Sequence, residues 1–203
     1  EAVEVTRKFT NLKLSLMPYL ARVAEQASNE GVPMMRPMVL EFPDDRGARA
    51  VDTQFMLGDA LCVSPVFSPD GACETYLPTS GWHHLLDGHS AGPGWVRGEY
   101  GFDSLGLFVR PGTVLPVGAV DDTPEYAWAE GVTLVAYDLP DGYDEVIVVP
   151  GGTGRSATFR VRRQGSTIHA SSADASAGWS LQVAGTARTA TADAAGEVRA
   201  ELG

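Results

Sequence analysis

The sequence is poor in cysteine, and the cysteines that it has are not arranged as metal ligands. Only 2 of its 203 residues are cysteines, so no framework of disulfides holds the fold together. Cys62 lies in an apolar stretch and is expected to be a small buried hydrophobic residue; a Cys62–Cys73 disulfide in an oxidising compartment is the alternative. The CxxC, HxxxH and HExxH spacings are absent, which argues against a zinc site, and we expect neither a metal nor a cofactor.

Basic residues are also scarce. Fifteen Lys and Arg against 26 Asp and Glu give a net charge of −11, which disfavours nucleic-acid and membrane-surface partners. No apolar run approaches the roughly 20 residues of a membrane-spanning helix. The N-terminal Glu1-Ala2-Val3-Glu4 lacks the basic start of a signal peptide, so we expect a cytoplasmic protein. Because the chain lacks an initiator Met, we also expect it to be part of a longer protein.

The first 60 residues have the pattern of an α/β fold. Apolar residues recur every three or four positions from Val3 to about Glu30, which predicts a helix, and Pro18 predicts a kink near Leu14. The apolar run Val32–Pro43 resembles a buried strand, and Thr53–Gly58 is expected to form one or two helical turns. A helix, strand, helix order is typical of an α/β barrel or a doubly wound sheet.

The remaining sequence alternates short apolar runs with Gly, Pro and Asp turns, which predicts antiparallel sandwiches. The strands expected in residues 61–118 are Leu61–Phe67, Glu74–Leu77, Gly81–Leu86, Leu107–Val109 and Thr113–Val117. Those expected in residues 119–203 are Thr133–Tyr137, Val146–Val149, Ala157–Val161, Thr167–Ala170 and Trp179–Val183. The tail after Gly185 either pairs as edge strands or stays loosely ordered.

Acidic residues are concentrated between Pro111 and Gly154, where eight acids occur without a base. The favoured interpretation is a solvated face that keeps the protein soluble. A calcium site is the alternative, but Asp138, Asp141 and Asp144 lack the alternating ligand spacing of a calcium loop.

Two groups of polar residues are candidates for chemistry. Asp44 and Asp45 follow the apolar run and form a carboxylate pair suited to acid/base work, although a turn or helix cap is favoured for them. Arg36 lies inside the run, so it must be paired; a structural tie is favoured over an active-site role. His83 and His84 are adjacent on a strand and point to opposite faces, so they cannot easily share a metal ion, and His89 lies in a turn.

Aromatic residues offer a third possibility. They could form a platform on which a sugar stacks, but a place in the sandwich core is favoured for most of them: Trp82, Trp95, Tyr100, Phe102 and Trp128. No G-x-S-x-G nucleophile elbow occurs, and Gly151–Gly154 has the pattern of a hairpin turn. The residues taken by themselves thus indicate a mixed α and β protein without a complete catalytic set.

Several longer strings occur in a fixed order: KLSLMPYL (13–20), GVPMMRPM (31–38), EFPDD (41–45), QFMLGD (54–59), VSPVF (63–67), YLP (76–78), GW (81–82), FVR (108–110) and LP (115–116). They resemble the family 31 glycoside hydrolases. The Phe-Pro-Asp-Asp step and the string Tyr126-x-Trp128-x-Glu130-Gly131 resemble the bacterial α-xylosidases within that family. The resemblance covers about residues 5–150.

The resemblance implies a mixed fold that is mainly β. Residues 1–60 would be the end of a catalytic (β/α)₈ barrel, residues 61–118 a proximal C-terminal β-sandwich, and residues 119–203 a distal one. A complete barrel takes about 250 residues, so it does not fit beside two sandwiches. The family is retaining and uses an Asp nucleophile in an Asp-x-Gly-Glu or Asp-x-Asn-Glu motif, which this sequence lacks. We therefore assign no catalytic, cofactor-binding or metal residue.

The expected function follows from that deficit. The chain would be an inactive, structural C-terminal fragment of an enzyme that hydrolyses terminal α-xylosyl residues of oligosaccharides, or α-glucosyl residues, with retention. A carbohydrate-binding or oligomerisation module is the alternative. Apolar residues of the barrel remnant would be exposed, covered by rearrangement or paired between copies, which predicts a homo-oligomer: Leu12, Leu16, Met34, Met35, Val39 and Met56.

Overall fold

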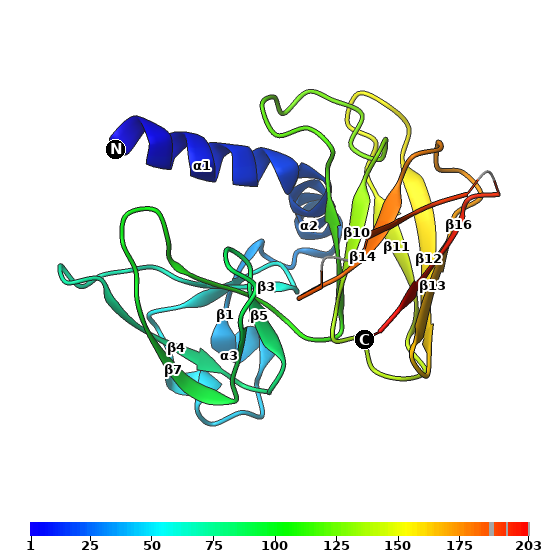
Figure 1. Ribbon diagram of the computed structural model, residues 1–203. Coiled ribbons are helices and arrows are strands. Elements are labelled where there is room, and N and C mark those ends of the chain that lie inside the picture. Colours follow the sequence, from blue (N-terminus) through cyan, green and yellow to red (C-terminus); the bar gives the residue numbers. More distant parts are fainter. Residues whose placement is uncertain (187–188, 194, 203) are drawn as a thin grey trace. The chain divides into compact units, whose positions relative to one another are not determined.

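The computed structural model describes residues 1–186, 189–193 and 195–202 (Figure 1). The chain divides into two compact units. Unit 1 consists of Glu1–Glu25 and Gly112–Gly203, and unit 2 consists of Gln26–Pro111. In the described part of the chain, no helix combines the length and the hydrophobicity needed to cross a membrane.

Residues 2–30 are helical, as the apolar spacing predicts, but the single kinked helix expected there is divided into α1 (Ala2–Ser15) and α2 (Met17–Glu30). The break between them lies at Leu16, two residues after the expected position. Pro18 has no N–H to donate to the carbonyl of Leu14, four residues earlier. The hydroxyl of Tyr126 donates to that carbonyl instead, over 3.0 Å. This hydrogen bond connects the C-terminal end of α1 to Tyr126 in the β-rich part of unit 1.

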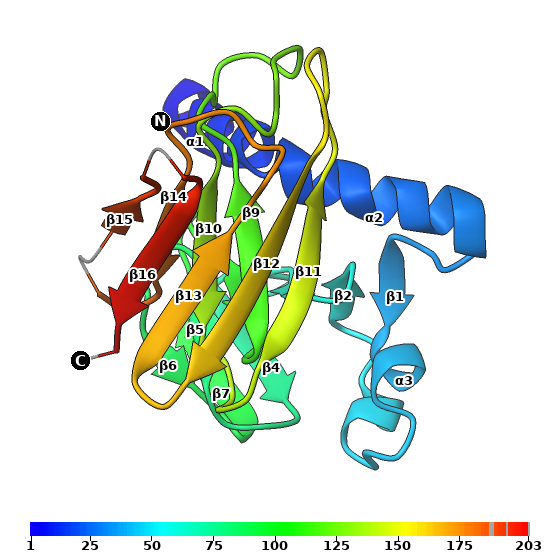
Figure 2. The same cartoon turned by 90° about the vertical axis from the view of Figure 1, so that its right-hand side faces the viewer.

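Unit 1 is a sandwich of two four-stranded sheets (Figure 2). One sheet has the order β15-β14-β10-β9, and its strands are β9 (Thr113–Val117), β10 (Thr133–Tyr137), β14 (Ser180–Val183) and β15 (Thr189–Thr191). The other has the order β11-β12-β13-β16, with β11 (Asp144–Val149), β12 (Ala157–Gln164), β13 (Thr167–Ser171) and β16 (Glu197–Glu201). All neighbouring strands are antiparallel except β10 and β14, which are parallel.

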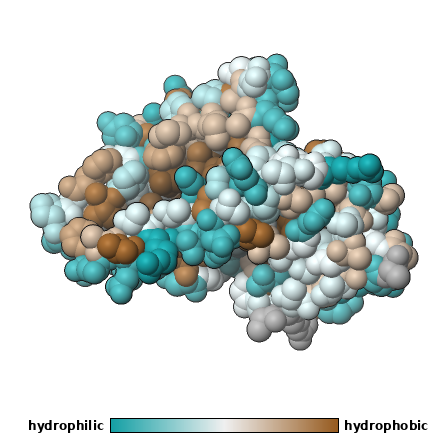
Figure 3. All heavy atoms as spheres, turned by 90° about the horizontal axis from the view of Figure 1, so that it is seen from above, coloured by the Kyte–Doolittle hydropathy of each residue, from teal (hydrophilic) through white to brown (hydrophobic). Residues whose placement is uncertain are grey.

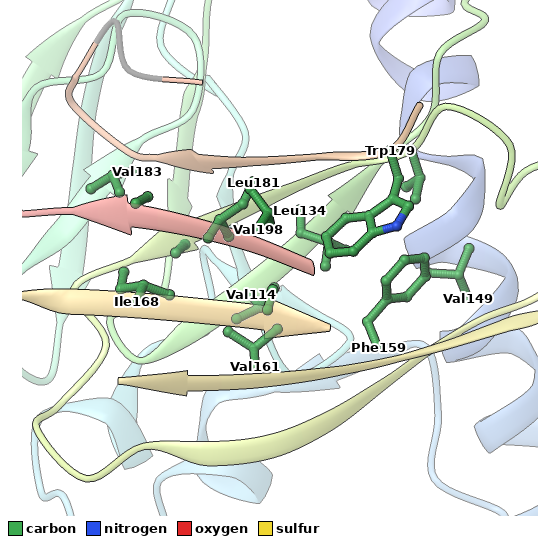
Figure 4. Close-up of a cluster of buried hydrophobic side chains, with 14 of the residues drawn as sticks. Val114, Leu134, Val149, Phe159, Val161, Ile168, Trp179, Leu181, Val183 and Val198 are labelled. Atoms are coloured by element: carbon green, nitrogen blue, oxygen red, sulfur yellow. The ribbon is translucent and has the colours of Figure 1, made fainter. Parts of the chain in front are cut away.

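The core of unit 1 lies between these sheets. Buried and exposed residues alternate along β12 and β16, so each strand turns one face inward. Phe159 and Trp179 are fully buried, and their rings meet edge to face with centroids 5.0 Å apart (Figure 4). This geometry is favoured by the ring quadrupoles and adds to the apolar burial.

Unit 2 combines a six-stranded and a two-stranded sheet. The larger has the order β1-β2-β3-β8-β5-β6, with β1 (Met35–Pro37), β2 (Phe55–Leu57), β3 (Leu61–Ser64), β5 (Trp82–His84), β6 (Ser90–Ala91) and β8 (Gly106–Val109). The smaller pairs β4 (Ala72–Leu77) with β7 (Gly94–Glu99). One helical turn, α3 (Met38–Glu41), and a 3₁₀ turn, Ala48–Ala50, precede β2. Met38, Met56, Trp82 and Phe108 are fully buried in its core.

Two predictions for the first 60 residues were wrong. Within Val32–Pro43 only β1 is a strand, because Pro37 has no N–H for a ladder and the chain turns into α3 directly after it. Thr53–Gly58 is not helical, since β2 pairs with β1 and β3. The buried Gln54 side chain supports this arrangement, because its amide bonds to both the N–H and the C=O of Tyr76 at 2.7 and 2.8 Å.

Strand β9 also lies elsewhere than expected. It was expected to end the 61–118 sandwich, but it pairs with β10 over five residues, and the compact units divide between Pro111 and Gly112. In the described part of the tail, β15 and β16 join the sheets of unit 1 as edge strands. Cys62 and Cys73 are both free and buried, so they form no disulfide. The chain is mainly β with several antiparallel sheets, as predicted.

Candidate functional site

A buried ionic network surrounds Arg36, whose side chain is only 5% exposed. Its Nη1 donates to Glu41 Oε1 over 2.6 Å, Nη2 to Gln26 Oε1 over 2.7 Å, and Nε to the carbonyl of Pro33 over 3.0 Å. The other oxygen of Glu41 accepts from Arg110 at 3.2 Å. Each of the three guanidinium nitrogens of Arg36 thus has a partner from the fold. Arg36 therefore connects neighbouring parts of the fold, as the favoured interpretation has it.

Asp44 and Asp45 have different surroundings. Asp44 is exposed, whereas Asp45 accepts the backbone N–H of Ala48 at 2.9 Å and the hydroxyl of Tyr76 at 3.0 Å. The Ala48 hydrogen bond lowers the pKa of Asp45; partial burial opposes this, and the Tyr76 hydroxyl lowers the pKa further. Asp45 therefore caps the turn that leads into Ala48–Ala50, as the favoured interpretation has it.

We expect Asp45→Ala to destabilise unit 2 by about 1 kcal/mol at pH 7, the usual cost of a lost cap. The native pKa of Asp45 is lowered, so its stabilising contribution is complete above the unfolded-state pKa of about 3.9 and is lost as the pH falls through the lower native value. Urea unfolding between pH 7 and pH 3 measures this difference. Asp44→Ala is the control and should change little at any pH; an equal loss in both variants would contradict the capping role.

Three side chains meet in the turn that joins β5 to β6. Nδ1 of His84 lies 2.9 Å from Oδ1 of Asp87, and Nδ1 of His89 lies 2.6 Å from the same oxygen. His84 is 1% exposed, whereas Asp87 and His89 are half-exposed. Burial raises the pKa of Asp87, but hydrogen bonds from the backbone N–H and the ring of His89 outweigh this effect and lower the pKa.

The sequence patterns did not predict this histidine cluster, which consists of His84, Asp87 and His89. His83 is not among the three residues that meet, which agrees with the expectation that it and His84 point to opposite faces. His89 comes close because the chain reverses at Gly88, whose φ of +79° favours glycine. The recognisable signal is the H-x-x-D-G-H string spanning residues 84–89.

The aromatic candidates divide between core and surface. Trp82 is fully buried, and Trp128 is half-buried with its Nε1 donating to the carbonyl of Pro124. Tyr100 is half-buried and its ring stacks on His84. The exposed members are Trp95 and Phe102. Trp95 lines an open hollow of about 700 Å³ in unit 2, together with Phe67 and the Arg97–Glu74 ion pair.

Two known family models match the β-rich regions of the chain. The model described as "Glycosyl hydrolase family 31 C-terminal domain" matches residues 31–115. The model described as "Alpha-xylosidase YicI, C-terminal domain" matches residues 127–203. The two matches follow one another along the chain.

Among curated proteins, an α-xylosidase of Emericella nidulans is 34% identical over 155 residues, which are 72% of this chain and 20% of that protein. The α-xylosidase XylQ of Lactiplantibacillus pentosus is 35% identical over 173 residues, 83% of this chain and 23% of that protein. The chain thus spans about a fifth of the length of these relatives.

Solved structures share the fold. The α-xylosidase of Xanthomonas citri superposes with a TM-score of 0.71 at 22% identity, covering 95% of this chain and 24% of that one. The cycloalternan-forming enzyme of Listeria monocytogenes superposes with a TM-score of 0.77 at 21% identity, covering 98% and 22%. The chain therefore belongs to glycosyl hydrolase family 31, and it carries the C-terminal β-domains of that family.

Proposed function

We propose that this chain is the structural, non-catalytic C-terminal region of a retaining glycosidase that removes terminal α-xylosyl residues from oligosaccharides. The observation that carries the proposal is the match of residues 127–203 to the C-terminal domain of an α-xylosidase, directly after the family 31 match. The two α-xylosidase relatives support the same substrate class.

Retaining glycosidases need two carboxyl groups about 5–5.5 Å apart, one as nucleophile and one as acid/base. Asp44 and Asp45 are poorly suited to supply them, because Asp45 already accepts hydrogen bonds from Ala48 and Tyr76. In this proposal both carboxylates come from the parent protein's barrel, and residues 1–60 complete that barrel. Strand β1 is suited to this, because it lies at the edge of its sheet and, among the described strands, pairs with β2 alone.

If the role is structural, a destabilising substitution in the core of unit 1 should lower the thermal stability of the parent enzyme and leave its catalytic efficiency unchanged. Phe159→Leu in the longer protein should shorten the half-life of activity at elevated temperature, because Phe159 is fully buried against Trp179. The kcat/KM at 25 °C should stay within twofold of wild type. A large fall in kcat/KM with unchanged thermal survival would contradict the structural role.

The proposed substrate class has its own test. The longer protein should hydrolyse a chromogenic α-xyloside with a higher kcat/KM than the corresponding α-glucoside. The reverse order would assign the parent to the α-glucosidases and leave the structural role of this chain intact.

We further propose that the chain on its own forms a homo-oligomer through exposed apolar residues. Among those expected at the barrel interface, Met35 and Val39 are exposed, whereas Leu16 and Met56 are buried. Hydrophobic patches on one face of the molecule are visible in Figure 3. Sedimentation should show a concentration-dependent dimer that Met35→Glu shifts toward monomer; a monomer at all concentrations would contradict this.

A carbohydrate-binding module is the second candidate. The observation that favours it is the hollow beside the exposed Trp95 and Phe67, since sugars stack on exposed aromatic rings. Titration with xylo-oligosaccharides should then quench Trp fluorescence in the wild type and not in Trp95→Ala. No response at millimolar ligand would reject this candidate.

We also propose a cytoplasmic location for the protein. Its support is that Cys62 and Cys73 are both free, as is usual in a reducing compartment.

A further inference from the structure

We propose that His84, Asp87 and His89 form a binding site for a borderline divalent cation such as Zn²⁺. Their ligand atoms, Nδ1 of each histidine and a carboxylate oxygen, all lie within 4.8 Å of one another. The site belongs to the turn between β5 and β6.

The tautomer of His84 makes the site ready for a cation. Nε2 of His84 lies 2.9 Å from the carbonyl of Leu105, and a carbonyl only accepts, so Nε2 carries a hydrogen. In a neutral ring Nδ1 is then an unprotonated lone pair. That lone pair is buried and makes no well-formed hydrogen bond, although it lies 2.9 Å from the Asp87 carboxylate. Two electron-rich atoms at this distance repel one another unless a proton or a metal ion lies between them.

The surroundings hold the ligands in place as supporting residues do in metal sites. A ligating histidine commonly donates its second ring nitrogen to a backbone carbonyl, as Nε2 of His84 does to Leu105. The fully buried ring of Phe108 packs against both histidines, with centroids 5.1 Å from His84 and 5.9 Å from His89. The backbone closes the turn, because His84 donates to the carbonyl of His89 over 2.8 Å.

The donor set selects the class of metal. Two imidazoles and a carboxylate suit Zn²⁺, Co²⁺ or Ni²⁺, whereas Ca²⁺ needs six to eight oxygen ligands. In a tetrahedral Zn²⁺ site with bonds of about 2.0–2.1 Å, ligand atoms are about 3.3 Å apart. The Asp87–His89 and Asp87–His84 distances of 2.6 and 2.9 Å must therefore widen slightly. Asp87 and His89 are half-exposed and have room to do so, and the fourth position is left for water.

The test uses the protein without a histidine tag, so that the tag does not bind metal. Co²⁺ titration at pH 7.5 should give one bound ion per chain with a visible absorption band, and Zn²⁺ should displace it. Ca²⁺ should not. Asp87→Asn and His89→Ala should each weaken binding at least tenfold, whereas His169→Ala, at a histidine outside the cluster, should have no effect. Equal affinity in wild type and in the double variant Asp87→Asn/His89→Ala would overturn the proposal.

Nitrogen NMR of the His84 ring separates a metal from a proton, even if a variant folds poorly. Zn²⁺ should shift the Nδ1 resonance while Nε2 keeps its hydrogen. A His84 ring that remains protonated on both nitrogens at pH 7.5 with Zn²⁺ in excess would show a proton-bridged cluster and overturn the proposal. Neither result depends on whether the parent enzyme is an α-xylosidase.

Discussion

Arg36→Met should destabilise unit 2 by about 3 kcal/mol. The replacement keeps much of the side-chain volume but leaves Glu41, itself only 15% exposed, without its 2.6 Å partner. Removing one member of a buried ion pair typically costs about 3–5 kcal/mol, because the other charge stays buried without compensation. Arg110 still contacts Glu41 at 3.2 Å, which places the expected loss at the lower end of that range.

Urea unfolding of unit 2 measures the loss of stability. Two further variants serve as a control and as a test that Arg36 and Glu41 act as a pair. Arg46→Met makes the same substitution at an exposed position and should change stability by less than about 0.5 kcal/mol. Glu41→Leu combined with Arg36→Met removes both charges and should recover part of the lost stability. The single variant Glu41→Leu completes the comparison. If the double variant loses as much stability as Arg36→Met and Glu41→Leu lose together, Arg36 and Glu41 do not act as a pair.

Trp179→Ala should destabilise unit 1 by about 3–5 kcal/mol, the usual cost of emptying a large buried aromatic site. Trp179 is fully buried, and the ring of Phe159 meets it edge to face at 5.0 Å, so truncation also removes that contact. The pair lies at one end of the buried cluster, beside Val149 (Figure 4). Because Phe159 is on β12 and Trp179 directly precedes β14, collapse around the cavity would require both sheets to shift.

Thermal unfolding followed by far-UV circular dichroism checks this result. Trp95→Ala is the matched control, because Trp95 is exposed on β7 in the other unit and its loss should change stability little. A loss below about 1 kcal/mol for Trp179→Ala, or an equal loss for Trp95→Ala, would contradict the assignment of Trp179 to the core.

Much of the fold could be predicted because local pattern and tertiary structure agree. The three-and-four spacing predicted the helical segment from Val3 to about Glu30, and Pro18 predicted a kink near the point where the structure divides it into α1 and α2, since a missing N–H acts locally. Strand β2 was mistaken for helix because its support is not local: Gln54 bonds to the backbone of Tyr76, which is 22 residues away. Strand β9 was assigned to the wrong sandwich for the same reason, since its partner β10 follows a long connection.

For the sites, too, local features could be predicted from the sequence and long-range contacts could not. That Arg36 must be paired followed from its apolar neighbours, but its link through Glu41 to Arg110 depends on the folded sheet. The histidine cluster was not predicted because its H-x-x-D-G-H string is none of the CxxC, HxxxH and HExxH metal spacings. Here a reversal at Gly88 brings His84 and His89 together across a hairpin. The family itself was recognised because long strings of sequence carry it.

The most direct test of the central claim is the hydrolysis of a chromogenic α-xyloside by this chain alone, beside the longer family 31 protein in the same assay. We predict turnover by the longer protein and none above buffer by the chain, because the proposal assigns both catalytic carboxylates to the parent protein's barrel and the cap role to Asp45, which accepts hydrogen bonds from Ala48 and Tyr76. Turnover by the pure chain that disappears in Asp44→Asn or Asp45→Asn would contradict a structural, non-catalytic role.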